Sequence, residues 1–171
     1  MKFTFVPDYV FSAFDEMSAD FLVGIGIKGV ILDIDNTLEP YENPEPGERV
    51  RTWLGALADR GIGCAFVSNN DRQRVERFNA ELGLPAFYKA GKPFKKNILL
   101  AMKQLGSDNT NTIMLGDQIY TDVWAARNAG ILAAVVPPIK DKTDVFTKFK
   151  RLLEKPVFAK YRKLRGKGDE K

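Results

Sequence analysis

Residues 29–38 read GVILDIDNTL, an apolar run that turns abruptly acidic. Continuous aliphatic residues of this length predict a strand buried on both faces, the kind found in parallel sheets. Asp33 and Asp35 stand two residues apart at its end, where an extended chain points both carboxylates to one side. Two like charges so close repel each other, and a divalent cation relieves the repulsion. The run therefore predicts a strand that brings carboxylates to a metal.

Four further apolar segments, each followed or preceded by an amphipathic segment, repeat this pattern along the chain. Strands are predicted at 62–67, 86–88, 112–115 and 131–136, and helices at 48–59, 72–82, through 98–105 and at 121–129. Parallel neighbours need crossover connections, which the intervening helices supply. The expected fold class is α/β, a three-layer Rossmann-like arrangement with a five-stranded parallel sheet and helices on both faces.

Polar side chains follow the predicted strands at the points where they end. Ser68, Lys92 and Asp117 each come after a different strand, and Asp122 lies about one helical turn beyond Asp117. In parallel sheets ligands bind beyond the carboxyl ends of the strands, so these side chains are expected at one edge. Taken singly, each has a structural explanation as a loop or helix-capping residue. Carboxylate oxygens without any imidazole favour Mg²⁺ as the metal.

The composition excludes several kinds of chemistry. The 171 residues include no histidine and one cysteine, which removes Ser-His-Asp and Cys-His nucleophile systems, histidine-bound zinc and any intramolecular disulfide. Cys64, inside a predicted strand, is expected to be an inert buried thiol. The length fits one domain, expected over 1–139, with 1–28 as an N-terminal covering segment. The aromatic and aliphatic spacing over 3–22 predicts a short amphipathic helix with an irregular lead-in.

Positive charge gathers at the C-terminal end of the chain. Residues 140–171 hold 12 Lys and Arg against 5 Asp and Glu, although the whole chain has a net charge of only +4. This segment is predicted to be a basic extension with one helix, a break at Pro156, a second amphipathic piece and a frayed end over 166–171. An anionic surface, either lipid headgroups or nucleic acid, is the partner that such charge favours. With no bilayer-length apolar run or cleavable leader, the expected location is cytoplasmic, with peripheral association at the inner face of the membrane as a further option.

Four motifs in order give the sequence a family resemblance. The string DIDNTL at 33–38 resembles the first motif of the haloacid dehalogenase (HAD) superfamily of aspartate-nucleophile phosphatases. Ser68 in FVSNN resembles the second motif, Lys92 in GKP the third, and GDQIYTD at 116–122 the fourth. Each sits at a predicted strand end. The aromatic start, the Asp-Asn-Thr-Leu form of the first motif and the basic tail resemble the capless IIIA group, which includes YqeG-like and phosphatidylglycerophosphate phosphatases.

The resemblance implies a role for each motif residue. Asp33 would be the nucleophile that attacks phosphorus and forms an aspartyl-phosphate. Asp35 would protonate the leaving oxygen, then deprotonate the hydrolytic water. Ser68, Asn69 and Lys92 would hold the phosphoryl oxygens, and Lys92 would also offset negative charge. The metal set implied for Mg²⁺ is Asp33, the backbone carbonyl of Asp35, Asp117 and Asp122.

The spacing of the motifs leaves no room for an inserted cap domain. A predicted helix, a strand and short turns account for all of the residues between the motifs, at 36–67 and again at 69–91. An uncovered site favours a large or surface-bound phosphorylated substrate, with a lipid phosphate such as phosphatidylglycerophosphate as the first candidate. Two alternatives remain: a soluble sugar or nucleotide phosphatase, and a module without catalysis that binds RNA, ribosomes or anionic membrane through its basic tail.

Overall fold

One parallel sheet forms the centre of the protein. The structure, a computed structural model, describes residues 5–140 and 145–165, with side chains over 5–140 and 154–164. Its strands are β1 (Tyr9–Val10), β2 (Gly29–Leu32), β3 (Gly63–Val67), β4 (Ala86–Phe87), β5 (Thr112–Gly116) and β6 (Leu132–Val135). They lie in the order β1-β6-β5-β2-β3-β4, and every pairing is parallel.

Register brings the strand ends together. Leu32 of β2 lies beside Phe66 of β3 and Leu115 of β5. The residues that follow these positions therefore emerge at the same carboxyl edge, with β2 in the middle. This confirms the expected parallel sheet and places the end of the DIDNTL segment between the ends of two neighbouring strands.

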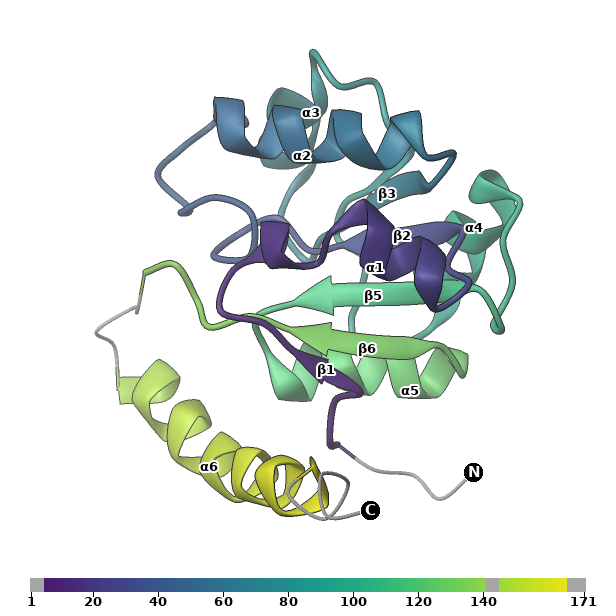
Figure 1. Cartoon of the computed structure of the whole chain (residues 1–171). Coiled ribbons are helices and arrows are strands. Elements are labelled where there is room, and N and C mark those ends of the chain that lie inside the picture. The colour runs from purple at the N-terminus through teal and green to yellow at the C-terminus, as the bar shows by residue number, and fades with distance from the viewer. Residues whose placement is uncertain (1–4, 141–144, 166–171) are drawn as a thin grey trace.

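Helices cover both faces of the sheet (Figure 1). On one face lie η1 (Phe14–Glu16), α1 (Ala19–Gly24), α2 (Glu48–Asp59) and α3 (Arg72–Asn79); on the other lie α4 (Lys96–Leu105), the π-helical turn η2 (Ile119–Val123) and α5 (Trp124–Ala129). Each face of the sheet has its own hydrophobic core, and alternate residues of β2 pack into them: Val30 and Leu32 into the first and Ile31 into the second. All three are fully buried, which is why β2 reads as a continuous apolar run.

The N-terminal segment differs from the prediction. The short helix is present as α1, but the chain before it forms η1 and a further strand, β1, so the sheet has six strands rather than five. β1 is held beside β6 by the Phe11 N–H, which donates to the Val135 carbonyl at 2.9 Å, and by Asp8, whose side chain accepts from the Ala133 N–H at 2.8 Å. A two-residue strand is too short to give a period-two pattern, so the sequence carries no signal for it.

The C-terminal segment is one helix, α6 (Val145–Arg165), and it lies outside the sheet (Figure 1). The predicted break at Pro156 is wrong, since the helix continues through it. Proline interrupts a helical hydrogen bond, but Val157 and Phe158 pack against the second core beside it and hold this turn in place. The predicted frayed end, 166–171, falls outside the described residues. Among described residues no helix is both long and apolar enough to cross a bilayer.

Candidate active site

Three carboxylates reach the carboxyl edge from two strand ends. Asp33 follows β2, Asp117 follows β5, and Asp122 comes back to the edge from η2. Gly116 makes this return possible, because a Cβ at that position would lie 2.3 Å from the Asp122 carboxyl carbon. Asp122 is then fixed by the Gln118 N–H, which donates to its Oδ2 at 3.1 Å. The glycine before Asp117 is thus a packing requirement of the site.

A buried lysine stands among these carboxylates. The Lys92 Nζ lies 2.7 Å from Asp33 Oδ1 and 2.7 Å from Asp122 Oδ1. One oxygen from each of Asp33, Asp117 and Asp122 lies within 4.8 Å of the others. Lys92 is 7% exposed and the three aspartates 6% or less. Three carboxylates and one ammonium group therefore share a small volume that solvent barely reaches.

Burial changes the acidity of this group. Removal from water raises the pKa of Asp33 from 3.8 to about 7, although the Lys92 charge works in the opposite direction and the Asp122 charge adds to the rise. For Lys92, burial lowers the pKa, but the carboxylates of Asp122 and Asp33 outweigh it and hold the pKa above its ordinary value. Lys92 is therefore a permanent cation, while the carboxylates beside it repel one another until further positive charge arrives.

Asn69 fixes the backbone that carries Lys92. Its Oδ1 accepts from the Lys92 N–H at 2.7 Å, and its Nδ2 donates to the Lys92 carbonyl at 3.1 Å. The Asn69 side chain, expected at the phosphate, is thus engaged with the lysine backbone. Ser68 follows β3 at the same edge, is 2% exposed, and accepts from the Asn70 N–H through its Oγ at 3.1 Å.

The Asp35 carboxylate is held by Arg74 of α3 and by Asn70 just before that helix. Arg74 Nε donates to Asp35 Oδ1 at 2.9 Å, and Asn70 Nδ2 donates to Asp35 Oδ2 at 2.9 Å. The same guanidinium donates through Nη1 to the Pro44 carbonyl at 3.0 Å. The Arg74 side chain is 9% exposed and the Asp35 side chain 18%. Arg74 and Asn70 are site residues that the sequence interpretation missed.

Glu154 is a third missed residue. It is 4% exposed, lies on α6, and its Oε1 accepts from the Ile119 N–H at 3.2 Å. Ile119 opens η2, the turn that carries Asp122. A buried glutamate thus links the C-terminal helix to the turn that carries Asp122. Its spacing within a run of basic and apolar residues gives no sign of this contact.

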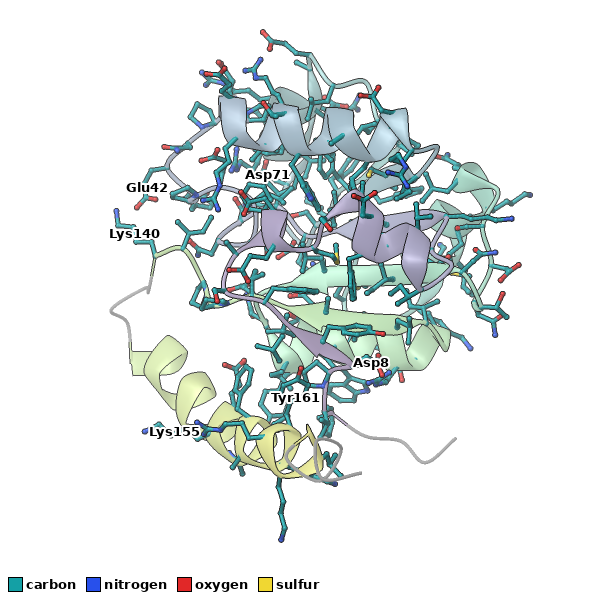
Figure 2. All side chains as sticks on the ribbon, viewed as in Figure 1. Asp8, Glu42, Asp71, Lys140, Lys155 and Tyr161 are labelled. Atoms are coloured by element: carbon teal, nitrogen blue, oxygen red, sulfur yellow. The ribbon has the colours of Figure 1, made fainter. Side chains whose placement is uncertain are left out.

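The segment between β2 and α2 is closed by its own contacts and contains no inserted domain. The Asn36 N–H donates to the Glu39 carbonyl at 2.7 Å, and the Gly47 N–H donates to Glu39 Oε1 at 2.9 Å. Farther out, Lys140 Nζ donates to Glu42 Oε1 at 2.7 Å, and Figure 2 shows the two side chains together at one side of the molecule. The expected absence of a cap agrees with this part of the described chain.

The donor set fits a hard divalent cation. Oxygen ligands from Asp33, Asp117 and Asp122 are close enough to share one ion, and a net negative, buried cluster lacks sufficient positive charge of its own. No thiol or imidazole is among these residues. A metal is therefore the group that this chemistry calls for.

Comparisons with known proteins agree with the motifs. A family model described as haloacid dehalogenase-like hydrolase matches residues 41–130. The chain is 30% identical over 159 residues to the probable phosphatase YqeG of Bacillus subtilis (strain 168), covering 93% of this chain and 92% of that protein. Over 111 residues it is 31% identical to the pyrophosphatase PpaX of Halalkalibacterium halodurans, covering 60% of this chain and 48% of that protein.

A solved structure extends the likeness to the backbone. The cobalt-bound deoxy-D-mannose-octulosonate 8-phosphate phosphatase (YrbI) of Haemophilus influenzae superposes with a TM-score of 0.51 at 25% identity, covering 73% of this chain and 75% of that one. These three relatives are named as phosphatases, and they give no support to the alternative of a module without catalysis.

Proposed function

Because the chain belongs to the haloacid dehalogenase-like hydrolases and is a phosphatase, we propose that it hydrolyses phosphomonoesters with Mg²⁺, through an aspartyl-phosphate on Asp33. The observation that carries the proposal is the buried cluster in which Lys92 Nζ lies 2.7 Å from both Asp33 and Asp122, with Asp117 alongside. Phosphoryl transfer depends chiefly on positioning and on neutralisation of charge, and this cluster supplies both.

In the first half-reaction an Asp33 oxygen attacks phosphorus and the bond from phosphorus to the ester oxygen breaks. The departing oxygen takes a proton from Asp35, so the alcohol leaves neutral. Lys92 and Ser68 hold the phosphoryl oxygens, and Asn69 holds Lys92 through its backbone. Arg74 and Asn70 donate to the two Asp35 oxygens and so set the position from which Asp35 reaches the ester oxygen.

In the second half-reaction water attacks the phosphorus of the aspartyl-phosphate. Asp35, deprotonated after the first step, takes a proton from that water, and the bond between phosphorus and the Asp33 oxygen breaks. Inorganic phosphate leaves and Asp33 is again a carboxylate. Asp33, the Asp35 backbone carbonyl, Asp117 and Asp122 would hold the metal, which when bound offsets the charge of the carboxylates and of the phosphoryl oxygens.

Hydrolysis of 4-nitrophenyl phosphate tests the proposal. We expect phosphate release with Mg²⁺, none after exhaustive treatment with a chelator, and recovery when Mg²⁺ is added back. Brief reaction and acid quenching should trap a protein with one added phosphoryl group, which hydroxylamine removes because an acyl phosphate is reactive. Turnover that persists in excess chelator, or a phosphoryl group on a residue other than Asp33, would contradict it.

For the substrate we propose a phosphomonoester presented at a lipid surface, with phosphatidylglycerophosphate as the first candidate. The support is the uncovered carboxyl edge: between β2 and α2 the described chain only turns back on itself through Glu39. A bilayer surface would cover a substrate bound at this edge, which no inserted domain of the described chain does. A panel of lipid, sugar and nucleotide phosphates decides, and high turnover of the soluble compounds without lipid would contradict this choice.

Arg74 provides a more specific test of the role of Asp35. Replacing Arg74 with Ala removes the cation that orients Asp35, so kcat/KM for an alkyl ester such as glycerol 3-phosphate should fall by about 10- to 100-fold. For 4-nitrophenyl phosphate the fall should be less than about 3-fold, because nitrophenolate leaves without a proton. The ratio kcat/KM is the right measurement because it reports the first half-reaction, in which the alcohol departs.

Arg77 offers the matched control. It lies on the same helix and reaches Glu45, but this pair is exposed and its N···O distance is 3.4 Å. Replacement of Arg77 with Ala should leave both kcat/KM values within about 2-fold, because exposed ion pairs contribute little. Equal losses on the two substrates in the Arg74 variant would mean that Arg74 acts on phosphate binding or on folding, and the assignment to Asp35 would be wrong.

A further inference from the structure

The most exposed large apolar side chain in the described part of the protein belongs to Phe94, at 75%. It stands two residues after Lys92, in the turn where the Phe94 N–H donates to the Gly91 carbonyl at 2.9 Å. Leu99, one turn into α4, is 43% exposed. This ring lies outside the described core, so its apolar surface is open to an external contact.

Lysines flank Phe94 in the sequence. Residues 82–107 contain five lysines and no acidic residue. Of these only Lys92 is buried, whereas Lys89, Lys95 and Lys96 are exposed beside Phe94 in the chain. We name the set of Lys89, Phe94, Lys95, Lys96 and Leu99 the Phe94 surface. The basic excess noted at the C-terminal end of the chain therefore has a local counterpart beside the active site.

Among the residues that the structure describes, the exposed lysines of the Phe94 surface lack the carboxylate partners that arginines have on the other face of the sheet. Arginines on or next to α2 and α3 each contact a carboxylate: Arg49, Arg51, Arg60, Arg72 and Arg77. Within the described residues no carboxylate pairs with Lys89, Lys95 or Lys96. Their charge is available to an external anion.

We infer that the Phe94 surface docks on an anionic lipid bilayer and brings the active-site edge to its headgroups. A protruding phenyl ring with an aliphatic neighbour enters the acyl boundary, and flanking lysines lie at the level of the headgroups. Nucleic acid fits less well. Tyr88, the other exposed ring beside these lysines, already has the Arg72 guanidinium over it at 5.8 Å from the ring centroid, so Phe94 alone would stack on bases, and its apolar neighbour is aliphatic. The inference rests on the proposed function for the lipid phosphate as substrate, but docking itself requires no catalysis.

The C-terminal helix is a less suitable anchor than its charge implies. Val157 and Phe158 of α6 pack against the second core, and Glu154 is buried against η2. The apolar side of this part of α6 is therefore committed to the protein. Leu164, 57% exposed on the same helix, gives a matched apolar control in a basic setting.

Vesicle co-sedimentation of the full chain tests the inference. The protein should bind vesicles of phosphatidylcholine mixed with phosphatidylglycerol, and should not bind phosphatidylcholine alone. Phe94→Ser should weaken vesicle binding by about 10-fold or more. The double variant Lys95→Gln/Lys96→Gln should weaken it by a similar factor, and its difference from the unaltered protein should disappear at high salt. Leu164→Ser should bind as the unaltered protein does. A melting curve followed by circular dichroism establishes that each variant is folded.

Further measurements distinguish a failure of membrane docking from a failure of catalysis. The Asp33→Asn protein should bind the vesicles normally, so failed catalysis leaves this readout intact. Wild-type-like binding by Phe94→Ser, or loss of binding in Leu164→Ser instead, would overturn the inference. It would also be overturned if the Phe94→Ser substitution weakened binding to single-stranded poly(U) but not binding to the vesicles.

Discussion

Replacing Asp33 with Asn is expected to abolish phosphate release and, in metal-free protein at neutral pH, to raise the free energy of unfolding. Activity should fall by at least about 10³-fold, because an amide oxygen does not form the aspartyl-phosphate. Stability should rise because the substitution removes one of three carboxylate charges from a cluster with a single lysine. A residue that the reaction needs thus destabilises the protein that carries it.

The pH dependence follows from the raised pKa of Asp33, about 7 against 3.8. The folded state holds this proton more tightly than the unfolded state, so its contribution to stability is complete below about pH 4 and is lost as the pH rises through about 7. Asn mimics the protonated form at every pH. The variant should therefore match the wild type near pH 4 and exceed it by about 2–4 kcal/mol near pH 8.

Urea unfolding in the presence of a chelator, followed by tryptophan fluorescence at several pH values, measures this difference. Asp59→Asn is the control, because Asp59 is exposed at the end of α2 and its replacement should change neither stability nor turnover. A stability difference that stays constant with pH would show that Asp33 titrates normally. An Asp33→Asn protein that retains activity would remove the nucleophile from the proposed mechanism.

The strand ends could be predicted from sequence because their signals are local. The run before Asp33 is buried on both faces and so is apolar throughout, and parallel strands necessarily place Ser68 and Asp117 at the same edge. Contacts between segments that are distant in the chain produce no local sequence pattern, so they could not be predicted. Arg74 differs from Arg72 and Arg77 only in the groups that the fold places beside it, the Asp35 carboxylate and the Pro44 carbonyl.

The same reasoning explains the errors in the N- and C-terminal segments. β1 exists because β6 offers it an unpaired edge, and its two residues have no periodicity of their own. Pro156 normally predicts a helix end, but side-chain packing by Val157 and Phe158 offsets one lost hydrogen bond. Tertiary contacts decide both cases. The residues that position Asp35 and η2 belong to this class, which is why Arg74 and Glu154 were missed.

Replacing Lys92 with Met should also abolish activity, by about 10²- to 10⁴-fold, but with the opposite effect on stability. It leaves Asp33, Asp117 and Asp122 without the cation that lies 2.7 Å from two of them. Breaking a buried pair of this kind costs about 3–5 kcal/mol, because the remaining charges are uncompensated. The raised pKa of Lys92 keeps its contribution present throughout the neutral range, so the loss should be seen at any pH near 7.

Mg²⁺ then distinguishes a charge effect from simple misfolding. Without the lysine the cluster is more negative, so saturating Mg²⁺ should raise the unfolding midpoint of Lys92→Met more than that of the wild type, and that of Asp33→Asn less. Lys103→Met, at an exposed position of α4, should respond as the wild type does. If Mg²⁺ stabilised all four proteins equally, the ion would bind elsewhere, and the three aspartates would be a cluster held by Lys92 alone.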